Sequence, residues 1–75
     1  MIGFGKRRDP EGAIGRGLAA YERADYAAAL EEWLAAAANH IPEAFYRLGL
    51  LYARGHGVLA NRADAARYYR QAAER

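Results

Sequence analysis

The sequence predicts an all-α domain built from two antiparallel helix hairpins. About a quarter of the 75 residues are alanine, the residue with the highest intrinsic helix propensity. The β-branched residues that favour strands are limited to three isoleucines and one valine, so the composition does not favour a β-sheet. A helical pattern also occurs twice along the chain, which indicates that one helix pair is repeated.

The first hairpin is marked by two aspartates at expected helix starts. Asp9 is a favourable N-cap and Pro10 suits the first helical position, so a first helix is expected over residues 10–22. Asp25 is a second N-cap candidate, and a second helix is expected from there to about residue 38. The link between the two helices is short, and short links place consecutive helices antiparallel.

The second hairpin is marked by a proline, two glycines and an asparagine. The third helix is expected to start near Pro42 and to end near Arg54. Gly55 can end it in a left-handed conformation, and Gly57 allows the chain to turn again. Asn61 is an N-cap candidate for a fourth helix that reaches almost to the end of the chain.

The internal repeat is visible when the second and fourth expected helices are aligned without gaps. At an offset of 36 residues, the pairs are Asp25 with Asn61, Ala29 with Ala65, and Trp33 with Tyr69. The first and third helices also align when the longer loop of the second hairpin is allowed for, and Gly17 then pairs with Gly49. Glycine and alanine at these positions allow two helices to approach closely, and we expect Trp33 and Tyr69 to be buried between the hairpins.

The chain divides into a basic arm at residues 1–9 and a helical domain at residues 10–75, with hairpins at 10–40 and 41–75. No stretch approaches the roughly 18–20 apolar residues of a membrane span. The first residues also lack the apolar run of a secretory signal. With no cysteine, no disulfide can form, and we expect a cytoplasmic protein that does not contact a membrane.

Catalysis and cofactor binding have little support in the composition. Serine, threonine and cysteine are absent, so the usual nucleophiles and the phosphate-binding Walker loop are excluded. His40 and His56 fall in turns with few carboxylates nearby, so no metal site is expected. Glu31 and Glu32 are adjacent on a helix and project about 100° apart, which does not suit a catalytic pair. We therefore expect neither an enzyme nor a bound cofactor.

The segment 43–73 resembles a Sel-one-like repeat, a relative of the tetratricopeptide repeat. The matching positions are Ala44, Leu48, Gly49, Tyr52, Gly55, Gly57, Val58, Asn61, Ala65, Tyr68, Tyr69, Ala72 and Ala73. The preceding hairpin resembles a tetratricopeptide hairpin at Gly17, Ala20, Asp25, Tyr26, Ala29, Trp33 and Ala36. The resemblance implies a short α-solenoid of two stacked hairpins. Arg16, His40 and Ile41 depart from it, since the family usually has an apolar residue, a glycine and a polar cap there.

A binding groove is expected from the first and third helices. Ile14, Leu18 and Tyr21 share one face of the first helix at i, i+4 and i+7. Four residues share one face of the third helix: Glu43, Tyr46, Leu50 and Arg54. In the resembled family these faces line a concave surface that binds peptides. The alternative is that they pack within the chain or against a second copy.

The function expected from these features is protein–protein interaction, as an adaptor or scaffold that binds a peptide or helix. Self-association into a homo-oligomer is also expected, because two repeats leave an edge uncovered, with Leu51, Tyr68 and Ala72 as candidate contacts. The alternative is a small nucleic-acid-associated protein, which would use the arm at Lys6, Arg7 and Arg8 and the arginines of the fourth helix: Arg62, Arg67, Arg70 and Arg75. The net charge of only +2 makes nucleic acid the less favoured partner.

Overall fold

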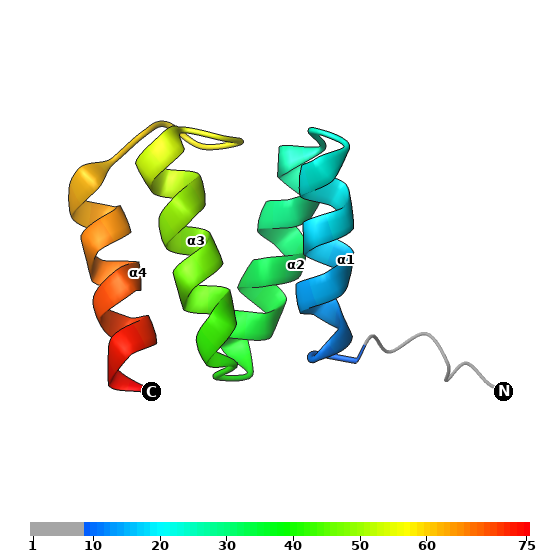
Figure 1. The fold of residues 1–75 in the computed structure, drawn as a ribbon, viewed down its shortest axis with the longest axis horizontal. Coiled ribbons are helices and arrows are strands. Elements are labelled where there is room, and N and C mark those ends of the chain that lie inside the picture. Colours follow the sequence, from blue (N-terminus) through cyan, green and yellow to red (C-terminus); the bar gives the residue numbers. More distant parts are fainter. Residues whose placement is uncertain (1–8) are drawn as a thin grey trace, which may run out of the picture.

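The computed structural model describes residues 9–75, which form four α-helices and no strand. The helices are α1 (Gly12–Glu22), α2 (Tyr26–Ala38), α3 (Pro42–Arg54) and α4 (Arg62–Glu74). Each helix packs against the next one along the chain, and consecutive helices run in opposite directions (Figure 1). The prediction of an all-α fold is confirmed for these residues.

The last three helices begin and end where the sequence predicts. The side chain of Asp25 accepts a hydrogen bond from the backbone N–H of Ala28, at 3.3 Å, and so caps α2. Asn61 caps α4 in the same way, through the N–H of Asp64 at 2.9 Å. Gly55 ends α3 at φ 73° and ψ 32°, the left-handed conformation that glycine adopts without steric cost.

The first helix begins at Gly12, two residues later than predicted from Pro10. Asp9 still acts at this end of the helix, because its carboxylate accepts hydrogen bonds from the N–H groups of Glu11, at 3.3 Å, and Gly12, at 3.2 Å. These bonds close a turn ahead of the first helical residue. The expected capping chemistry is present, but it acts on a turn that precedes α1.

The main core lies where α1, α2 and α3 meet. Its buried members come from these three helices: Ala20, Ala29, Trp33, Leu48 and Leu51. Trp33 is only 2% exposed, and its indole Nε1 donates a hydrogen bond to the backbone oxygen of Ile14 at 3.2 Å. The burial predicted for Trp33 is confirmed. Tyr69 is only half-buried, so the burial predicted for that residue is wrong.

In the α3–α4 hairpin, the ring of Tyr69 lies very close to the backbone of Gly49. An ideal Cβ placed on Gly49 would lie 2.5 Å from Cε1 of Tyr69, far inside van der Waals contact. The absence of a side chain at Gly49 therefore gives the Tyr69 ring the space it occupies. Tyr69 packs over the backbone of α3 while its outer edge stays accessible to solvent.

Candidate functional site

The predicted groove faces of α1 and α3 meet through a hydrogen bond at their C-terminal ends. The guanidinium Nη1 of Arg54 donates to the hydroxyl of Tyr21 at 2.9 Å. This hydrogen bond, more than any other interaction, raises the pKa of Arg54 above its ordinary value. The hydroxyl of Tyr21 also lies 3.0 Å from Nδ1 of His56. Tyr21 thus fixes the position of an exposed cation at the end of α3.

An aromatic cluster surrounds this hydrogen bond. The Tyr21 ring centroid lies 5.2 Å from that of Tyr26 and 5.9 Å from that of Trp33. The His56 ring stacks on Tyr26 with centroids 4.4 Å apart and planes at 7°. From the sequence, His56 was considered only as a metal ligand, and no metal site was expected there. No local pattern could have revealed its place, because Tyr21 and His56 are distant in sequence and meet only through the fold.

The two apolar α1 residues of the predicted groove are partly used inside the chain. Ile14 and Leu18 are half-buried and pack against the core that contains Trp33 and Leu48. Tyr21 is also half-buried against the same core. These residues join the first hairpin to the second and leave only part of their surface accessible.

The α3 residues of the predicted groove are more accessible. Tyr46 is 49% exposed, and its ring lies 5.9 Å from that of Tyr69 on α4. Leu50 is half-buried one turn further along. At the other end of the face, the exposed carboxylate of Glu43 accepts from Nη2 of Arg47 at 2.7 Å. The face formed by Tyr46, Leu50 and Arg54, called the α3 face below, combines apolar surface with a cation.

The predicted self-association edge is placed differently by the structure. Leu51 has no exposed surface and belongs to the core, so its prediction as uncovered apolar surface is wrong. Tyr68 and Ala72 are half-buried. Burial raises the pKa of the Tyr68 phenol, with a further contribution from Tyr52, whose ring lies 5.4 Å away. Only Tyr68 and Ala72 of the three retain accessible surface.

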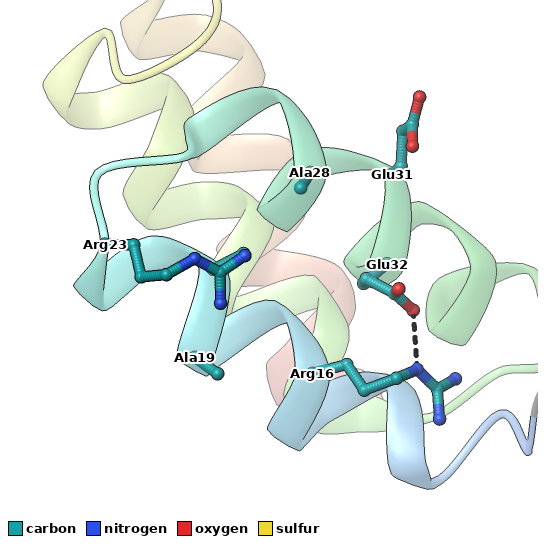
Figure 2. Close-up of a pocket in the computed structure, with 7 residues that line it drawn as sticks. Arg16, Ala19, Arg23, Ala28, Glu31 and Glu32 are labelled. Atoms are coloured by element: carbon teal, nitrogen blue, oxygen red, sulfur yellow. Dashed lines mark hydrogen bonds and ion pairs between the residues drawn. The ribbon is translucent and has the colours of Figure 1, made fainter.

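A depression of about 360 Å³ lies between α1 and α2, and sequence reasoning did not find it. It is lined by small and charged side chains: Arg16, Ala19, Ala20, Arg23, Ala28, Glu31 and Glu32. Figure 2 shows Arg16 reaching from α1 toward Glu32 on α2, where Nε donates to Oε1 at 3.1 Å. This ion pair gives Arg16 a partner within the chain. Four charged side chains and three alanines line the depression, whereas hydrophobic and aromatic side chains predominate in a typical ligand pocket.

The arginines of α4, and Arg75 directly after it, are partly engaged within the chain. Arg67 forms an ion pair with Asp64, and the Arg75 guanidinium lies 4.4 Å from the centroid of the Phe45 ring. The basic arm at Lys6, Arg7 and Arg8 lies outside the described residues. Between residues 9 and 75, no group of three or more His, Asp or Glu side chains is arranged to hold a metal ion.

No family model, curated protein or solved structure matches the chain. Within the described part of the chain, no helix combines the length and the apolar character needed to cross a membrane. The arrangement of the described side chains is therefore the basis for assigning a function.

Proposed function

We propose that the chain is a protein-interaction module, a short α-solenoid of two stacked hairpins that binds a peptide or helix along the α3 face. Ile14, Leu18 and Tyr21 of α1 would form the adjoining wall, and Glu43 would lie at the rim. The observation that carries the proposal is Tyr46, a large aromatic side chain that is 49% exposed beside half-buried Leu50. Tyrosine is one of the residue types that most often dominate the energetics of protein interfaces.

The support for Tyr46 comes from its surroundings. Its ring is bounded by the Tyr69 ring on one side, and Leu50 lies one helical turn away. An amphipathic partner would bury the exposed parts of both side chains at once, and burial of apolar surface is favourable by roughly 25 cal/mol per Å². A rigid aromatic ring also loses little conformational entropy when it is buried.

A nucleic-acid-binding role remains the second candidate, with less support. Of the four arginines predicted to bind nucleic acid, Arg67 is paired with Asp64 and Arg75 lies over Phe45, so two of the cations already have partners. A binding role that depends on phosphates loses affinity steeply as salt is raised, whereas an apolar face does not. Binding of a DNA oligonucleotide measured over a salt series therefore separates the two candidates.

Self-association is a separate proposal that draws on Tyr68 and Ala72 alone, because Leu51 is buried. A homo-oligomer would cover their accessible surface, and its mass would depend on protein concentration. Light scattering at micromolar concentration measures this mass directly. A monomeric mass across the range would exclude the edge as an interface.

The groove is tested by selecting binders from a display library of helical peptides. The wild-type chain should enrich specific peptides, and the Tyr46→Ala/Leu50→Ala double variant should lose them. Leu34→Ala is the matched control, because Leu34 is 44% exposed and belongs to α2 and not to the α3 face. Equal enrichment by the wild type and the double variant would place the binding site elsewhere.

A further inference from the structure

Starting from the proposed function, we infer that the partner of the α3 face is an amphipathic helix carrying an acidic side chain, which pairs with Arg54. Apolar side chains of the same helix would then cover Leu50 and Tyr46. Three features of the structure support this partner: Arg54 has no carboxylate partner among the described residues, Tyr46, Leu50 and Arg54 follow one another along α3, and Glu43 lies at the opposite end of the helix.

Arg54 is an exposed cation without a carboxylate partner among residues 9–75. Four other arginines of the described residues pair with carboxylates: Arg16 with Glu32, Arg23 with Asp25, Arg47 with Glu43, and Arg67 with Asp64. Arg54 shares the lack of such a pair with the three remaining arginines of the described residues, but it differs from them in its hydrogen bond to a side chain on another helix. The acceptor of that bond is a neutral phenol, Tyr21. The polar groups that raise its pKa are all tyrosines, Tyr21 first and then Tyr69 and Tyr46.

The hydrogen bond to Tyr21 orients Arg54 and leaves most of its donors unused. A guanidinium has five N–H donors, and the bond to Tyr21 occupies one on Nη1. The planar fork matches the two oxygens of a carboxylate, so a pre-oriented guanidinium loses less conformational entropy on pairing. The site is therefore prepared for a carboxylate that the described chain does not supply.

The order of residues along α3 suits a helical partner. Tyr46, Leu50 and Arg54 follow one another at four-residue intervals, which is about 6 Å per step along the helix axis. A helix laid along α3 repeats its own side chains at nearly the same distance. An acidic residue over Arg54 would then place apolar residues one and two turns away over Leu50 and Tyr46.

The opposite end of the α3 face offers no unpaired cation. Glu43 is exposed beyond Tyr46 and pairs with Arg47. Because each of these two charges compensates the other, an acidic partner residue gains less there than beside Arg54. The acid of the partner helix is therefore expected at the Arg54 end of the α3 face.

A carboxylate on an apolar helix fits this face better than a phosphate backbone. Nucleic-acid binders spread many cations along the path of the backbone, whereas the α3 face has Arg54 alone beside Tyr46 and Leu50. The apolar neighbours would contribute nothing to phosphate binding.

The test uses the helical peptides selected by the wild-type chain. Those that depend on Tyr46 and Leu50 should be enriched in Asp or Glu about one turn from one apolar residue and two turns from another. In a synthetic copy of one such peptide, Glu→Gln should weaken binding to the wild-type chain about fivefold, the upper range for an exposed ion pair. Added salt should reduce this difference.

Two variants of the protein identify the cation. Arg54→Met should bind the Glu and Gln peptides equally, whereas the control Arg67→Met should keep the preference, because Arg67 pairs with Asp64 and lies outside the α3 face. Tyr21→Phe retains the ring and removes the hydroxyl that orients Arg54, so it should show a reduced preference. The comparison of Glu and Gln peptides on the wild-type chain needs no variant to fold.

Different peptide results would reject the pairing with Arg54 and the groove itself. Peptides that depend on Tyr46 and Leu50 but show no acidic preference would overturn the pairing with Arg54 and leave the groove intact. An acidic preference that persists in Arg54→Met would also overturn it. If no selected peptide depends on Tyr46 and Leu50, the groove itself is rejected and the inference with it.

Discussion

Gly17 lies against the indole of Trp33 so closely that a Cβ on the glycine would stand 2.3 Å from Nε1 of the ring. Gly49 and Tyr69 have the same relationship in the second hairpin, where the corresponding distance is 2.5 Å. In each hairpin the first helix contributes a glycine and the second helix packs an aromatic ring over it. The sequence alignment pairs these same residues.

Gly17→Ala should destabilise the fold by about 1–3 kcal/mol, the usual range for overpacking a core. Trp33 is buried and its Nε1 is held by the Ile14 carbonyl, so the ring has little freedom to move. Gly49→Ala should cost less, because Tyr69 is half-buried and its ring can swing outward. Urea unfolding of the two variants gives the comparison, and a larger loss for Gly49→Ala would contradict this account.

Gly15→Ala is the control for both substitutions. Gly15 also lies within α1, but no atom comes within 4 Å of a Cβ placed there. Alanine should therefore stabilise the fold by up to about 1 kcal/mol through its helix propensity alone. A larger side chain at Gly49 increases the difference from this control. Gly49→Leu should lower the free energy of unfolding by on the order of 1–3 kcal/mol.

His40→Gly should raise stability by about 1 kcal/mol. His40 follows α2 and has φ 61°, a left-handed conformation that costs a residue with a Cβ roughly 1–2 kcal/mol. It is exposed, so little packing is lost with the imidazole. The midpoint of urea unfolding measures the gain, and His40→Ala, which keeps the strained backbone and removes the ring, is the control. A gain of the same size in His40→Ala would show that backbone strain is not the cause.

Tyr68→Phe should reduce the loss of stability at alkaline pH. Burial raises the pKa of the Tyr68 phenol, so the folded state keeps this proton at pH values where the unfolded state has released it. The contribution to stability is thus complete below the ordinary tyrosine pKa of about 10 and is lost as pH rises through the higher folded value. Unfolding free energies of the wild type and variant at neutral pH and near pH 11 provide the test. Parallel losses in the two proteins would exclude Tyr68 as a source.

Tyr46→Ala should weaken binding of a selected peptide by roughly 2 kcal/mol or more if Tyr46 is a hot spot. The substitution should change the free energy of unfolding only a little, because about half of the Tyr46 side chain is exposed and its ring contacts that of half-buried Tyr69. Titration calorimetry and urea unfolding on the same variant separate the two effects. An affinity within a factor of two of the wild type would remove Tyr46 from the interface.

The sequence predicted the helices well because their ends are set by local chemistry. Asp25, Asn61 and Gly55 act within one turn of their own positions, so the residue types alone indicate the boundaries. The start of α1 was missed by two residues because Asp9 accepts from two consecutive N–H groups and closes a turn first. Both outcomes follow from contacts between residues two to four positions apart.

The candidate site was predictable only in part. Helical spacing placed Tyr46, Leu50 and Arg54 on one face, but it could not show that Leu51, the next residue after Leu50, is buried in the core. The hydrogen bond between Tyr21 and Arg54 joins residues on different helices, so it depends on how the hairpins pack. The spacing of residues shows which of them share one face of a helix, whereas the packing of the helices determines which face is exposed to solvent.

The loop between α3 and α4 is divided into two parts with different tolerance for extra sequence. Its beginning is fixed to the first hairpin, since His56 stacks on Tyr26 and a Cβ on Gly57 would lie 3.0 Å from that of Tyr26. Its middle is free, because Leu59 is 91% exposed. A peptide tag inserted beside Leu59 would project into solvent, whereas the same insertion between His56 and Gly57 would disrupt the contacts of this part of the loop with Tyr26. The loop should therefore tolerate added length at Leu59 better than at His56.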